Sequence, residues 1–206
     1  IDFDIDGIAA INWSGMGSLI EETTAPTVTV AESITSTTNF IRNRLTQMTI
    51  VPNTASYTTA QAALMEAGGY SITLTGGSIT ISNNITYITP EELGIVNIPI
   101  GHVTGNRSFS GTFNCYLVDD DGNTSESSDF WQDMAALKDV VTHDFDITFN
   151  IGGSTGDPRL SVNFPTATVE IPTHSIEDII SLETNFTGLP STIDATDEAT
   201  VIYYAT

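Results

Sequence analysis

Three aspartates alternate with apolar residues in the first six residues of the chain, IDFDID. With the glycine that follows, Asp2, Asp4 and Asp6 match the opening of an EF-hand calcium loop, in which oxygen ligands alternate before a sharp turn. The match then fails, because Trp13 stands where the final bidentate glutamate belongs and no amphipathic helix flanks the segment. We therefore interpret the carboxylates as one solvated side of a β-strand, whose side chains point alternately to its two faces.

Catalytic chemistry is the next possibility, because GGSTG at 152–156 matches the nucleophile-elbow motif GxSxG, with Ser154 as the nucleophile. That motif requires a helix directly after the serine, whereas Asp157, Pro158 and an alternating strand pattern follow here. The three histidines are isolated and lack metal-ligand spacing. We therefore predict no catalytic residue, no cofactor and no metal site, and we expect that the protein is not an enzyme.

Acidic side chains dominate the composition, since 26 Asp and Glu oppose 5 Lys and Arg, for a net charge of -21 over 206 residues. Binding to nucleic acid through phosphate neutralisation needs clustered basic side chains, so this composition excludes that mode. The acids are spread along the chain and 40% of residues are hydrophobic, which indicates a folded, self-repelling surface. The single cysteine, Cys115, rules out an internal disulfide framework, and no apolar stretch is long enough for a membrane-spanning helix.

Alternation of β-branched and polar residues recurs along the chain and predicts a mainly β fold. The predicted strands lie at 71–82, 97–103, 107–118, 143–151, 159–164, 167–171 and 199–204. We place a hairpin turn at Gly76 and Gly77, within the first of these runs. Residues 14–39 are rich in Ser, Thr and Gly and predict a long loop or arm. The sequence begins inside a strand pattern and without methionine, so we expect that N-terminal residues are missing from it.

One convincing helix interrupts the strands, at 127–139. Ser128 is its predicted N-cap, and Phe130, Met134 and Leu137 follow one another on a single helical face. We expect this face to pack on a sheet. A weaker helical pattern occurs at 58–69, which has threonine caps, several alanines and a glycine at its end.

The segment from 83 to 117, followed by an acidic turn and a helix that carries a tryptophan, resembles the tail tube (major tail) proteins of tailed bacteriophages. The recurring positions are Asn83, Asn84, Ile85, Tyr87; Thr89, Pro90, Glu91, Leu93; Pro99, Ile100, Gly101; and Arg107, Ser108, Ser110, Gly111, Phe113, Cys115, Tyr116. The segment 5–15 also looks like a strand and turn of that family. The resemblance covers most of 1–15 and 70–180.

The resemblance implies a single tail-tube-like domain over 1–206, a β-sandwich or barrel with one flanking helix. It implies hexameric rings that stack into a hollow tube, through which viral DNA passes without specific binding. The implied partners are other copies, the tape measure, the tail terminator and baseplate or tip proteins, without a membrane. The implied location is the tail of a virion, after synthesis in the host cytoplasm.

A channel through which a polyanion passes should not bind it. Under this resemblance, the aspartates at the start of the chain would line the channel and repel the phosphates of DNA. The alternation repeats in DFDITFNI at 144–151. The candidate lumen-facing acids are Asp2, Asp4, Asp6, Asp144 and Asp146. The alternatives are a calcium-dependent β-sandwich adhesin or surface module that uses the aspartate clusters, and a hydrolase that uses Ser154. The sequence does not distinguish a contractile from a non-contractile tail.

Overall fold

The computed structural model describes residues 1–4, 7, 9–15, 43–88, 101–119, 125–137, 144–152, 159–171, 173–176 and 180–204. The strands in these ranges are β1 (Asp2–Asp4), β2 (Gln47–Pro52), β3 (Tyr70–Ile72), β4 (Leu74–Ser82), β5 (Ile85–Ile88), β6 (Gly101–Thr104), β7 (Ser108–Tyr116), β8 (Phe145–Ile151), β9 (Arg159–Val169), β10 (Thr173–Ile176), β11 (Ile180–Gly188) and β12 (Thr200–Tyr204). The α-helices are α1 (Thr59–Ala62) and α2 (Ser127–Ala136). The predicted mainly β class, with one substantial helix beside the strands, is confirmed. The predicted arm at 14–39 lies outside the described residues from position 16 onward.

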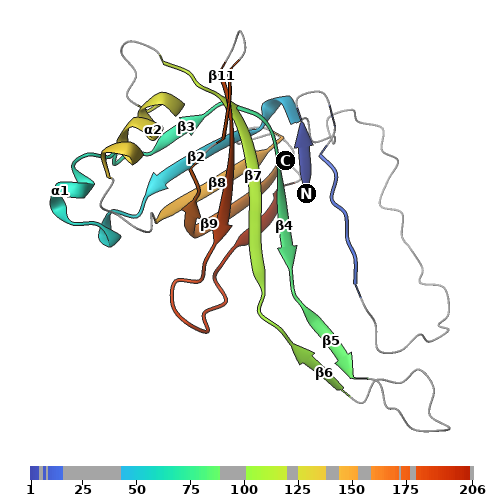
Figure 1. Ribbon diagram of the computed structural model, residues 1–206. Helices are drawn as coiled ribbons and strands as arrows, with labels where there is room; N and C mark the ends of the chain where they lie inside the picture. Colours follow the sequence, from blue (N-terminus) through green and yellow to red (C-terminus); the bar gives the residue numbers. More distant parts are fainter. Residues whose placement is uncertain are drawn as a thin grey trace, which may run out of the picture.

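One antiparallel sheet of ten strands contains nearly all of the β structure, in the order β1-β4-β7-β11-β9-β8-β2-β3 (Figure 1). β10 pairs with β11, and β12 pairs with β9. β9 is shared between two neighbours, because residues 159–163 pair with β12 and residues 167–169 pair with β11. The remaining pair, β5 and β6, forms a separate two-stranded hairpin.

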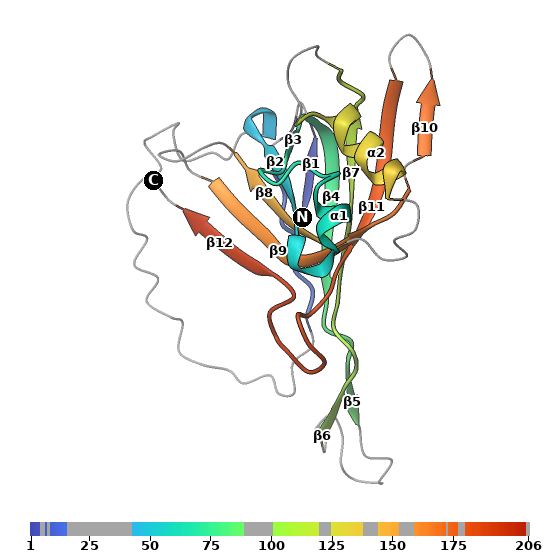
Figure 2. The ribbon, with the colours of Figure 1, turned by 90° about the vertical axis from the view of Figure 1, so that its left-hand side faces the viewer.

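The sheet curls so that its two halves face each other across a common core (Figures 1 and 2). Phe3 in β1 and Phe149 in β8 are distant in the strand order, yet their ring centroids are 5.9 Å apart. Phe186 in β11 contacts the rings of both Phe149 and Phe164, at 5.4 and 5.1 Å. One layer therefore consists of β1, β4, β7 and β11, and the other of β9, β8, β2 and β3.

Two glycines face this core, and aromatic rings fill the space that their missing side chains leave. The ring of Phe3 lies against Gly77 and that of Phe186 against Gly111, and each of these pairs is directly opposed in the register. A Cβ atom at either glycine would stand within 2.8 Å of the ring. The predicted hairpin turn at Gly76 and Gly77 is wrong, because both residues lie inside β4 and pair with β7, just after a β-bulge. The glycines give close packing here and not a reversal of the chain.

Helix α2 packs its predicted apolar face against β3 and β8. Phe130 is fully buried, with its ring 5.1 Å from Tyr70 and 5.5 Å from Phe145. Leu137, which caps the C-terminus, is 3% exposed, and Met134 is half-buried against the core. The N-cap is Glu126 and not the predicted Ser128, since the Glu126 side chain forms a capping box with Asp129.

A polar contact joins α2 to β3. The hydroxyl of Tyr70 donates a hydrogen bond of 2.6 Å to Asp133 Oδ2 and accepts one from the backbone amide of Glu66. Burial raises the pKa of Asp133, and the hydrogen bond from Tyr70 opposes this shift. The second predicted helix, at 58–69, is reduced to α1, where Thr58 and Gln61 form a capping box.

Replacement of Leu137 by alanine should lower the free energy of unfolding by about 2 to 4 kcal/mol, because it removes a buried side chain and leaves a cavity. Gln132→Ala, at an exposed position of the same helix, is the matched control and should change stability by less than about 0.5 kcal/mol. Urea unfolding measures both values. Equal effects from the two substitutions would show that the helix does not contribute to the core.

Candidate functional site

The outward side of the layer formed by β1, β4, β7 and β11 carries hydroxyl, amide and carboxylate side chains. Cross-strand register aligns them in rungs, such as the one that runs from Asp2 through Ser78 and Thr112 to Asn185. We call this surface the polar face, and its residues are Asp2, Asp4, Ser78, Thr80, Ser110, Thr112, Asn114, Glu183, Asn185 and Thr187. It exists because polar residues alternate in each strand with the buried residues of the core.

Charge on the polar face is entirely negative. Asp2, Asp4 and Glu183 are exposed, and no Lys or Arg is among its residues. Two of its hydroxyls, Ser78 Oγ and Thr112 Oγ1, lie 3.2 Å apart and satisfy each other. Strong phosphate binding depends on basic side chains that replace counterions, and the residues of this surface include none; their hydroxyl and amide groups offer a phosphate only neutral hydrogen bonds. A polyanion next to this surface would therefore be bound weakly or repelled.

The five candidate acids do not come together. Asp2 and Asp4 lie on the polar face, whereas Asp6 lies outside the described residues. Asp144 and Asp146 belong to the other layer, at the start of β8 and within it. Because the rings of β1 and β8 meet in the core, the outward sides of these strands point in opposite directions. The two pairs of acids therefore lie on opposite outer surfaces.

Asp144 and Asp146 are half-buried and have hydrogen-bond partners. The carboxylate of Asp144 accepts hydrogen bonds from Asn53 Nδ2 at 2.7 Å and Ser56 Oγ at 2.6 Å. Asp146 Oδ1 accepts one from Asn163 Nδ2 at 2.5 Å. These contacts fasten β8 to the turn after β2 and to β9, which gives both residues a part in the fold.

Most of the polar face was missed by sequence reasoning, which selected only its aspartates. The signal was present in ISLETNFTG, where Ser181, Glu183, Asn185 and Thr187 alternate with the residues that β11 buries. Among the described residues, no group of three His, Cys, Asp or Glu side chains is placed to bind a metal ion. No helix in the described part of the chain has the length and apolar character needed to cross a membrane.

A second surface is the hairpin of β5 and β6, which extends away from the body (Figures 1 and 2). We call it the hairpin arm. It carries exposed apolar side chains at Ile85, Ile88 and Val103, the last with 56% exposure. Because an isolated two-stranded hairpin is marginally stable in water, these side chains favour contact with another surface.

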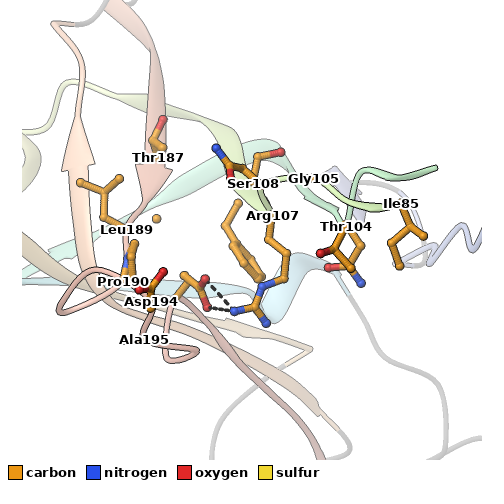
Figure 3. A pocket seen from close by; sticks show the side chains of 15 residues that line it. Ile85, Thr104, Gly105, Arg107, Ser108, Thr187, Leu189, Pro190, Asp194 and Ala195 are labelled. Carbon is orange, nitrogen blue, oxygen red and sulfur yellow. Dashed lines mark hydrogen bonds and ion pairs between the residues drawn. The ribbon is translucent and has the colours of Figure 1, made fainter. Parts of the chain in front are cut away.

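An ion pair clamps the base of the hairpin arm, beside an open cleft (Figure 3). Nη2 of Arg107 donates to both carboxylate oxygens of Glu198, at 2.9 and 3.1 Å. Nearby, Asn84 Nδ2 donates to the carbonyl of Asn106 and the amide of Gly105 donates to the carbonyl of Asn84. The two strands are thereby fixed where they leave the body.

Loss of Arg107 and loss of Glu198 should lower the free energy of unfolding by different amounts. The side chain of Glu198 is 10% exposed and that of Arg107 is 37% exposed, so an unpaired arginine can regain water more easily than an unpaired glutamate. Arg107→Met should therefore destabilise the protein by about 1 kcal/mol more than Glu198→Gln in urea unfolding near neutral pH. An equal or reversed order would mean that the carboxylate is solvated in the folded protein.

Comparison with known proteins places the chain beside the tube-forming proteins of phage tails. One matching protein is tail tube protein pb6 of Escherichia phage T5, which is 31% identical to the chain over 207 residues. The match covers 96% of this chain and 41% of that protein, so the chain spans less than half the length of this relative. The resemblance to tail tube proteins is thus confirmed. No protein-family model matches the chain.

Two solved assemblies contain chains with some likeness in structure. One is the baseplate of the anti-feeding prophage, with a TM-score of 0.47 and 7% identity, over 69% of this chain and 87% of that chain. The other is the extended sheath-tube complex of the PVC extracellular contractile injection system, with a TM-score of 0.40 and 16% identity, over 90% of this chain and all of that chain. These likenesses are too weak to support a conclusion.

Proposed function

We propose that the chain is a structural subunit of a phage tail tube, with residues 1–206 as one tail-tube-like domain. Copies form hexameric rings, the rings stack into a hollow tube, and viral DNA passes through the tube during ejection. The observation that carries this proposal is the sequence relation to a tail tube protein along nearly the whole chain. The sequence similarity to a tail tube protein also agrees with a structural role without catalysis.

The proposed location is the tail of the virion, after synthesis in the host cytoplasm. The hairpin arm favours contact between rings, because it extends away from the body of the subunit (Figure 1) and carries exposed apolar side chains. A tube that ends at defined points also needs a tape measure, a tail terminator and a baseplate or tip protein as partners. These partners follow from the proposed role.

The polar face is the proposed wall of the bore, with Asp2, Asp4 and Glu183 as its described acids. Asp144 and Asp146 cannot line the same wall, since they lie on the opposite outer surface. Duplex DNA presents about one negative charge per 1.7 Å of its axis, so an acidic wall without cations releases no counterions and holds no phosphate. The polyanion can then move past without specific binding.

The proposed assembly is testable with the purified chain in negative-stain electron microscopy. We expect rings and tubes with an open centre, and six copies per ring in averaged end views. Salt of a few hundred millimolar should favour assembly, because screening weakens the repulsion between copies of net charge -21. A chain that remains monomeric at every concentration and salt level would contradict the proposed function.

The proposed wall is testable with a matched pair of lysine substitutions on opposite outer surfaces. Thr80→Lys adds a cation to the polar face, and Gln47→Lys adds one to the exposed side of β2 in the other layer. In phage particles that carry each variant, Thr80→Lys should slow DNA ejection at low salt, with recovery at high salt, because each ring gains a band of phosphate-binding charge. Gln47→Lys should eject DNA at the parental rate. The opposite result would place the other surface at the bore.

A further inference from the structure

Strand β12 is an edge strand that is apolar on both of its sides. Its one strand neighbour in the described chain is β9, against which Val201 pairs with Val162 and Tyr203 with Leu160. All five residues of β12 are exposed, although four of them are large apolar or aromatic residues. An edge strand of this kind presents unpaired backbone groups to any chain that can add to the sheet.

The core of the subunit is open where it reaches β12. Val162 and Leu160 are buried, whereas their partners Val201 and Tyr203, on the same side of the sheet, remain 47% and 58% exposed. In the described part of the chain, the apolar layer that begins inside the protein therefore continues to exposed side chains at the surface. On the other side of β12, the guanidinium of Arg159 lies over the ring of Tyr204, 4.0 Å from its centroid.

β12 also lacks the features with which soluble proteins protect an edge strand. Such strands usually carry a charge, a proline or a bulge that discourages pairing. The segment 199–204, ATVIYY, contains no charged residue and no proline, and its pairing with β9 has no register shift. In a chain of net charge -21, this is a place where two like-charged copies can approach with little repulsion.

We propose that β12 forms a contact between subunits. Its edge and its exposed apolar side pack against the next copy of this chain, on a surface other than that copy's own β12. The proposal rests on the proposed tube function, which makes another copy the expected occupant. A contact between β12 and β12 would be two-fold symmetric and would close at a dimer. A ring needs a heterologous contact, in which β12 meets some other part of its neighbour.

A pair of variants with the same added charge tests the contact. Tyr203→Lys places an ammonium at the proposed contact, and Leu64→Lys places one just after α1, at a residue that is 49% exposed and does not belong to β12 or its partner β9. Both variants make the chain less negative, so long-range repulsion falls equally in both. We expect Tyr203→Lys to raise the concentration for half-maximal assembly by at least about tenfold, because a buried unpaired ammonium is costly.

Leu64→Lys should assemble as the parent chain does, and Tyr203→Phe should also retain assembly. Sedimentation velocity measures assembly, and circular dichroism with thermal unfolding verifies that each variant is folded. If the parent chain assembles and Tyr203→Lys assembles equally well, the β12 contact is wrong while the tube function stands. If the parent chain does not assemble at all, the tube function itself is contradicted, and the contact with it.

A single-cysteine variant distinguishes the two symmetries. Cys115 is fully buried, and burial raises the pKa of its thiol to about 11, so it should not react in the folded protein. Ile202→Cys therefore gives one reactive thiol, on β12. A heterologous contact should leave it monomeric under mild oxidation in assembled rings, whereas disulfide-linked dimers in high yield would show a two-fold β12 contact and overturn the proposal.

Discussion

The packing of phenylalanine rings on glycines holds the curled sheet in shape, and the surfaces described above depend on it. Phe186 lies at the centre, in contact with Phe149 and Phe164 and directly over Gly111. A side chain at this glycine would collide with the ring and with the carbonyl of Ser78, so β4 and β11 could not both keep their distance from β7. The spacing of the strands that form the polar face therefore depends on this internal contact.

Alternation in the sequence predicted the mainly β class and most long strands, because a half-buried strand shows its two faces directly in the order of its residues. It failed at Gly76 and Gly77, since glycines at a turn and glycines beneath an aromatic ring look alike until the partner ring is known. It also grouped Asp144 with Asp2, because a local pattern says which residues share a strand face but not which way that face points. The direction depends on how the sheet curls, which is set by contacts such as that between Phe3 and Phe149.

Association between copies, on which the proposed tube depends, must overcome the repulsion of like charges. Screening at physiological salt limits this repulsion to about 8 Å, so only groups near a contact matter strongly. The described strands of the hairpin arm and β12 carry no charged residue, whereas carboxylates lie on the polar face and the loops. The charge is therefore arranged so that apolar contact and acidic exposure occupy different parts of the surface.

The hairpin arm is continuous with the body, because β5 follows β4 and β6 leads into β7 with only short links between them. A tensile load applied along the arm would therefore enter the long antiparallel ladder between β4 and β7, which extends from Ser82 and Ser108 to Leu74 and Cys115. Both strands would be pulled in the same direction, so the load would pass, in shear along the strands, to the hydrogen bonds that join β4 to β1 and β7 to β11. In the proposed tube, a force along the arm would therefore enter the body of the subunit through this pair of strands.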